Sequence, residues 1–171
     1  GSGSNIRFNG EIMDSRLISQ NILVSAIAFE DSKAELYSFG KAESHVAEIG
    51  KKLREIADST ENVCAVELIF PGAKMDSLSL LEQVGKCRPE ISIFGGYPIG
   101  HDMDNDETFV VDTDGADSHK VLAVVYSGKE LHVNADKTAG WEKLGSPFTI
   151  TKAYGHLLAE INQTPALEVY E

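Results

Sequence analysis

The chain has 171 residues, of which 42% are hydrophobic and 25% are charged, an ordinary composition for a globular domain. Its formal net charge of −12 argues against a surface for nucleic acid or anionic membrane, because both need a dense basic patch. No apolar run approaches the roughly 18 residues of a membrane-spanning helix, so no membrane insertion is expected.

A single cytoplasmic domain is predicted over residues 5–171. Gly1–Ser4 read GSGS and are interpreted as a cloning remnant, and no secretory signal is visible. Cys64 and Cys87 have neither a CxxC spacing nor a histidine at a ligand spacing. Two such cysteines are typical of reduced thiols in a cytosolic protein.

A hairpin and a helix are predicted first along the chain. Residues 22–29 (ILVSAIAF) are typical of a buried strand, and the alternating segment 34–39 (AELYSF) is expected to pair with it through residues 30–33. An amphipathic helix follows over residues 43–58, because its apolar residues recur on one stripe. These stripe residues are Val46, Ile49, Leu53 and Ile56.

A strand, a helix and a second strand come next. Residues 63–70 (VCAVELIF) are so densely apolar that they predict a central strand, which Pro71-Gly72 ends. A helix over residues 75–87 begins with Asp76 or Ser77 as its cap. The short strand 91–94 (ISIF) then ends in a pair of glycines. This order predicts a parallel pair of strands joined by a crossover helix.

The rest of the chain is rich in strand-like segments separated by turn residues, which predicts an antiparallel meander. Pro165 is interpreted as the start of a helix that the chain enters only briefly, so a longer polypeptide is expected. The fold class is therefore α/β (α+β), with a mixed sheet, two main helices and an antiparallel strand-rich C-terminal half. The strand-like segments are 109–112, 121–126, 131–133, 148–151 and 157–161.

Three segments resemble the FIST family of sensory domains, named for F-box and intracellular signal transduction. They are FGGYPIGHD (Phe94–Asp102), TFVVDTDG (Thr108–Gly115) and the long block from AGWEKLG to PALEVY (Ala139–Tyr170). The resemblance covers roughly the last two thirds of the chain, from Val63 onward. The second, C-terminal FIST subdomain is absent, so truncation before that subdomain is expected.

The resemblance implies sensing rather than catalysis. FIST domains occur in bacteria, fused to or encoded beside output modules such as diguanylate cyclases and histidine kinases, which implies two-component or cyclic-di-GMP signalling. The resemblance implies a small ligand, and an amino-acid-like molecule is the candidate. Some members bind haem and respond to nitric oxide, which makes a haem-based sensor an alternative.

The glycine loop after residue 94 is the first candidate for the ligand site. Gly95, Gly96 and Tyr97 follow the predicted parallel strand, and open α/β sheets tend to bind ligands at the carboxyl ends of such strands. The loop departs from the family, because Gly96, Tyr97 and Pro98 replace the usual cysteine and serine. His101 follows the loop and is the candidate axial ligand in the haem alternative.

The C-terminal block adds further candidates. Trp141 and Tyr154 lie near glycines and are interpreted either as packing residues or as walls of a pocket. Lys152 stands among apolar residues, and a half-buried lysine needs a partner, either a ligand carboxylate or an acid such as Glu160. The predicted ligand-binding residues are Gly95, Gly96, Tyr97, His101, Trp141, Lys152 and Tyr154.

Other functions are less well supported by the residues. Asp102, Asp104 and Asp106 alternate, but a calcium loop starting at Asp102 would need glycine and glutamate where Glu107 and Thr113 stand, so no metal is predicted. The chain has no GxSxG or other catalytic signature, so no enzyme is predicted. A protein-interaction domain, with a homodimer as one form, remains the alternative that needs no small ligand.

Overall fold

The computed structural model describes residues 11–13, 16–18, 24, 26–72, 75–98, 108–136, 142, 145–154 and 157–170. Two compact units make up the chain, the first over residues 1–135 and the second over residues 136–171.

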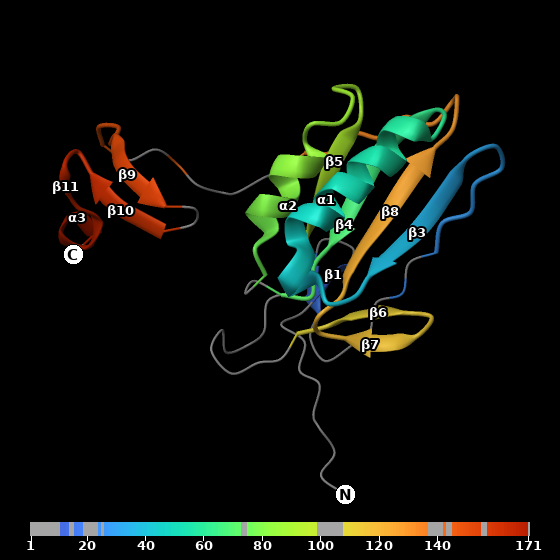
Figure 1. Ribbon diagram of the computed structural model, residues 1–171, viewed down its shortest axis with the longest axis horizontal. Coiled ribbons are helices and arrows are strands. Elements are labelled where there is room, and N and C mark those ends of the chain that lie inside the picture. The colour runs from blue at the N-terminus through green and yellow to red at the C-terminus, as the bar shows by residue number, and fades with distance from the viewer. Residues whose placement is uncertain are drawn as a thin grey trace, which may run out of the picture. The chain divides into compact units, whose positions relative to one another are not determined.

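A four-stranded mixed sheet forms the centre of the first unit, in the order β3-β8-β4-β5. β4 and β5 run parallel, and β8 runs antiparallel to both β3 and β4. Helices α1 and α2 lie on the same face of this sheet (Figure 1). The α+β class is therefore confirmed. The elements are β3 (Lys33–Phe39), α1 (Ala42–Ser59), β4 (Val63–Ile69), α2 (Ser77–Val84), β5 (Ser92–Gly96) and β8 (Val121–Ser127).

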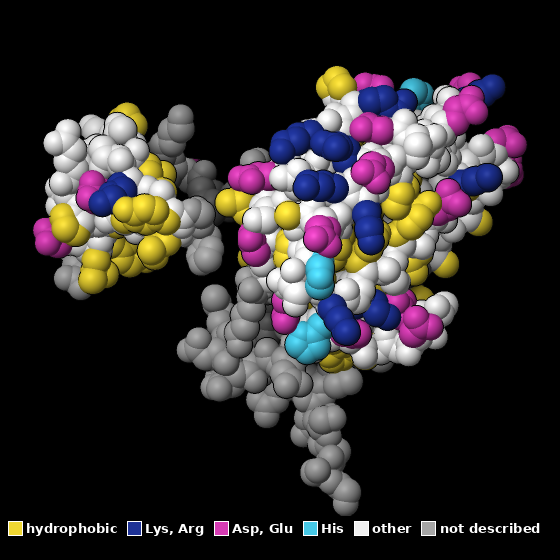
Figure 2. Space-filling view, in the orientation of Figure 1, with side chains coloured by type: hydrophobic (Ala, Val, Ile, Leu, Met, Phe, Trp, Pro, Cys, Tyr) yellow, Lys and Arg dark blue, Asp and Glu magenta, His cyan; other side chains and the backbone are white. Residues whose placement is uncertain are grey.

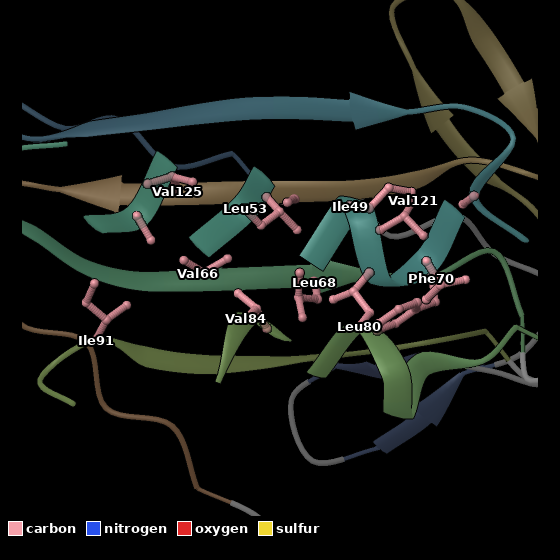
Figure 3. Packing of buried hydrophobic residues seen from close by; sticks show 14 of the residues in the cluster. Ile49, Leu53, Val66, Leu68, Phe70, Leu80, Val84, Ile91, Val121 and Val125 are labelled. Carbon is pink, nitrogen blue, oxygen red and sulfur yellow. The ribbon is translucent and has the colours of Figure 1, made fainter. Parts of the chain in front are cut away.

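The hydrophobic core lies between the two helices and the sheet (Figure 3). Leu53 of α1, Leu68 of β4 and Leu80 of α2 are each at most 1% exposed. Full burial of such a side chain stabilises the fold by about 1.5–3 kcal/mol. Gly50 allows the helices to approach closely, since a Cβ there would lie 2.7 Å from the backbone oxygen of Leu80.

At one end of each helix, a side chain forms hydrogen bonds with backbone groups. Asp76 caps α2 as predicted, because its Oδ1 accepts a hydrogen bond from the backbone N–H of Ser79 at 3.1 Å. At the C-terminal end of α1, Nη2 of Arg88 donates hydrogen bonds to the carbonyl oxygens of Ala57 and Thr60, at 3.0 and 3.3 Å. Arg88 therefore links the segment after α2 to the last turn of α1.

The predicted N-terminal hairpin is wrong. Segment 34–39 does form a strand, β3, but its partner along the whole length is β8, from Lys33 opposite Ser127 to Phe39 opposite Val121. Residues 24 and 26–29 are not in a strand. The physical reason is that an apolar run indicates burial but does not indicate which strand it pairs with. β8 is mostly buried and apolar, so it can lie in the middle of the sheet between two other strands.

The remaining strands form small antiparallel pairs. In the second unit, β9 and β10 pair as the meander predicted, and α3 begins directly after Pro165. Two parts of the meander are wrong: segment 121–126 is β8 of the main sheet, and residues 131–133 form no strand. The small elements are β1 (Glu11–Met13), β2 (Arg16–Ile18), β6 (Val110–Asp112), β7 (Gly115–Asp117), β9 (Ile150–Tyr154), β10 (Leu157–Ile161), β11 (Thr164–Pro165) and α3 (Ala166–Tyr170).

Candidate functional site

The glycine loop lies at the carboxyl end of β5, beside the carboxyl end of the parallel strand β4. Gly96 is opposite Ile69 in the register, and its carbonyl oxygen accepts a hydrogen bond of 3.0 Å from the backbone N–H of Phe70. Tyr97 is 47% exposed. The predicted position at the carboxyl end of a parallel strand is confirmed, but the strand is longer than predicted, because Gly95 and Gly96 are its last two residues.

The two glycines of this loop have different roles. Gly95 has a φ of +146°, and a Cβ there would collide with the backbone of Leu68. Gly95 is therefore required by the backbone alone. A Cβ at Gly96 would meet nothing within 4 Å. Gly96 therefore leaves open space at the end of the strand, where a ligand can approach the backbone.

A polar and aromatic cluster lies on the sheet face opposite the helices, which we call the helix-free face. The hydroxyl group of Tyr126 on β8 donates a hydrogen bond of 2.6 Å to Oε2 of Glu67 on β4. Phe94 of β5 stands opposite Glu67 in the register. These side chains point away from α1 and α2 because their strand neighbours, such as Val66 and Val125, pack into the core.

Two aromatic rings pack against the ring of Tyr126. The rings of Phe94 and Tyr126 are stacked, with centroids 6.4 Å apart and planes 17° apart. The ring of Phe29 meets Tyr126 edge-on at 6.3 Å. Ala65, which is fully buried, is opposite Tyr126 in the register, so its small side chain leaves room for the larger rings. The cluster thus combines a carboxylate with an aromatic surface.

The charge of Glu67 is not balanced within the cluster. Burial and the neighbouring carboxylate of Glu67 raise the pKa of Tyr126 to about 12, so the phenol stays protonated near neutral pH. Over the part of the chain that the structure describes, no Lys, Arg or His forms an ion pair with Glu67. A half-buried carboxylate with one neutral donor is therefore available to a ligand.

Among the described residues of the first unit, the most buried ion pair is structural. Oδ2 of Asp112 accepts hydrogen bonds from Lys120 Nζ and Ser38 Oγ, both at 2.7 Å. Its Oδ1 accepts from the backbone N–H of Asp114 at 2.9 Å. With its acceptors occupied, Asp112 ties the β6–β7 hairpin to β3 and to the start of β8.

The predicted residues of the C-terminal block lie in the second unit. Lys152 Nζ is 3.6 Å from Oε1 of Glu160 and 5.7 Å from the ring centre of Tyr154. Contacts with Tyr154 and with Glu160 raise the pKa of Lys152. The structural partner that the sequence suggested, Glu160, is thus the observed one. The side chain of Lys152 is 48% exposed, which agrees with the half-buried lysine that the sequence predicted.

Two predicted site residues, His101 and Trp141, lie outside the described residues, as does the acidic loop of residues 102–106. The histidines that are described, His45, His119 and His132, are all exposed, which does not suit an axial haem ligand beneath an apolar cavity. Within the described ranges, no group of three or more His, Cys, Asp or Glu side chains is arranged to hold a metal ion.

Sequence reasoning missed Glu67 and Tyr126. A signal was present, because Glu67 is the one charged residue in the strand VCAVELI and Tyr126 the one aromatic residue in VLAVVYS. The sequence did not indicate that these two side chains are in contact, because 59 residues separate them.

Comparison with known proteins agrees with the resemblance seen in the sequence. The family model of the FIST N domain matches residues 8–164, so the match begins well before Val63. Searches of curated proteins and of solved structures found no match. Over the described residues, no helix has the length and apolar character to cross a bilayer. The chain therefore belongs to the FIST family of signal-transduction sensory domains, and what it matches is the family's N domain.

Proposed function

We propose that this chain is the ligand-sensing input domain of a cytoplasmic, bacterial signal-transduction protein. It binds a small, amino-acid-like molecule and regulates an output domain such as a diguanylate cyclase or a histidine kinase. The observation that supports the proposal best is the cluster of Glu67, Tyr126 and Phe94 on the helix-free face. Phe94 lies two residues before Gly96 in β5, so the cluster is close to the open space at Gly96.

The arrangement suits binding better than catalysis. Ligands of open α/β sheets approach the carboxyl ends of parallel strands, which is where Gly96 and Tyr97 lie. The cysteines are poor nucleophiles, because burial raises the pKa of both Cys64 and Cys87. Cys64 also donates a hydrogen bond to the carbonyl oxygen of Tyr126, at 3.5 Å.

A thermal-shift screen with amino acids and related metabolites tests this function. A ligand that binds only the folded state stabilises it by about 2.7 kcal/mol at 100 times its Kd, so the Tm rises. Gly96→Val should abolish the ligand-induced shift by filling the open space. Gly40→Val is the matched control, since a Cβ at Gly40 also meets nothing within 4 Å. Absence of a shift with every compound would count against ligand sensing.

Protein interaction is a second candidate function, favoured by the apolar surface of the second unit. None of the described residues of this unit is buried. Ile150 and Tyr154 share one face of β9, with exposures of 63% and 58%, and Leu157, opposite Tyr154, is 59% exposed. If a second copy of the chain covers this face, light scattering will show a dimer that Ile150→Ser and Leu157→Ser dissociate. A monomer at high concentration would contradict it.

A further inference from the structure

We propose that Glu67 recognises the positively charged amine or guanidinium group of an organic ligand, which rests against the ring of Phe94. This inference rests on the proposed ligand-binding function and names the chemical class of the ligand. Three properties of the helix-free face support it: an unbalanced charge, a free acceptor atom and an adjacent aromatic ring.

The unbalanced charge belongs to Glu67. Its side chain is half-buried in a strand whose other residues are almost all apolar. Removing a carboxylate from water is unfavourable unless a cation or several donors replace the lost hydration. Tyr126 supplies one neutral donor, and the described residues supply no cation. A cationic ligand would balance the negative charge of Glu67.

The free acceptor atom is Oε1 of Glu67. Tyr126 occupies Oε2, and among the described residues Oε1 has no hydrogen-bond partner. It is also not sealed from solvent, because the one buried polar atom without a partner in the described part is Nε of Arg88. An ammonium or guanidinium N–H can therefore reach Oε1 while the bond to Tyr126 is kept. Hydrogen bonds between charged groups are roughly twice as strong as neutral ones.

The aromatic ring is that of Phe94. It stands beside Glu67 across the parallel pair β4 and β5, and it stacks on Tyr126 with planes 17° apart. A cation over an aromatic face gains about 0.5–1 kcal/mol at an exposed site and about 2 kcal/mol when desolvated. Carboxylate and ring thus favour the same kind of ligand group.

The same features disfavour anionic ligands. The chain has a net charge of −12, and a carboxylate or phosphate placed next to Glu67 would meet a like charge. An amino acid would therefore bind here through its amino or side-chain cation. Basic amino acids and diamines fit better than acidic amino acids of the same length.

Calorimetric titration at neutral pH tests the inference with three probes of equal chain length. Putrescine is the diamine, 1,4-butanediol is its neutral counterpart and succinate is its anionic counterpart, with L-arginine as a guanidinium probe. Putrescine or L-arginine should bind, and the neutral and anionic probes should not. Glu67→Gln, which keeps the shape and an acceptor for Tyr126, should weaken cation binding roughly tenfold or more.

The matched control is Glu35→Gln. Glu35 is an exposed strand carboxylate of the same sheet, two residues before Tyr37, which packs on the helix side. The Glu35→Gln variant removes the same charge from the chain as Glu67→Gln, so a general electrostatic effect would appear in both variants. Phe94→Leu is a second variant, expected to weaken cation binding roughly threefold or more through loss of the ring.

The outcomes separate the inference from the proposed function. Cation binding that Glu67→Gln weakens and Glu35→Gln does not would support the inference. Equal weakening by both variants, or none by Glu67→Gln, would overturn it. Binding of neutral or anionic compounds alone would also overturn it, while leaving the sensory function in place. If no compound of any charge binds, both proposals fail. If Glu67→Gln does not fold, unchanged cation affinity of Phe94→Leu overturns the inference.

Discussion

Replacing Gly95 with alanine should strain the backbone where β5 pairs with β4, whereas the same replacement at Gly96 should be tolerated. Gly95 has a φ of +146°, and its added Cβ would collide with the backbone of Leu68. Such a backbone conformation in a residue with a side chain costs about 1–3 kcal/mol. Loss of the hydrogen bond between Phe70 and Gly96 adds about 0.5–1.5 kcal/mol.

The expected loss of stability in Gly95→Ala is therefore about 1.5–4.5 kcal/mol relative to Gly96→Ala. The pair is well matched, because both changes reduce the entropy of the unfolded chain equally. Urea unfolding followed by far-UV circular dichroism measures the difference. Equal stability of the two variants, within about 0.5 kcal/mol, would refute the assigned geometry of this loop.

Three further predictions concern the core, a helix cap and an ion pair. Leu53→Ala should reduce the free energy of unfolding by about 2–5 kcal/mol in urea unfolding, because Leu53 is fully buried. Asp76→Ala should cost about 1 kcal/mol in the same assay, by removing the cap of α2. Hydrogen bonds from Lys120 and Ser38 lower the pKa of Asp112 from 3.8 to about 2. The stability that this shift provides is present above pH 3.8 and is lost as the pH falls through about 2. Acid titration of the Tm should show this loss in the wild type, and Asp112→Asn should reduce it.

Local features of the sequence predicted the helices and the parallel pair well. The stripe of apolar residues in 43–58 requires one buried face, and α1 buries it. Asp76 was one of two neighbouring residues predicted to cap α2, and the structure shows that it is the cap. Pro71-Gly72 separates β4 from the following segment, so the crossover to β5 could be inferred from order and spacing. Each of these features depends on interactions within a few residues.

The candidate site was predicted only in part. The loop of Gly95 and Gly96 was found because glycines after a strand are visible in the sequence. Glu67 and Tyr126 were not found, because their contact depends on β8 entering the sheet next to β4. The predicted members Lys152 and Tyr154 belong to the second unit, where their contacts are with each other and with Glu160.

The sequence by itself determined the membership of the FIST family, the helices and the position of the glycine loop, since motifs and periodicity are properties of short segments. Only the tertiary structure decided that β8 lies between β3 and β4 and pairs with both. The apolar pattern of β3 would suit several partners, and the choice of β8 depends on how all four strands together bury one face under α1 and α2. That choice placed a carboxylate from β4 beside aromatic rings from β5 and β8. The chemistry proposed for this protein therefore arises from long-range pairing, which no local pattern encodes.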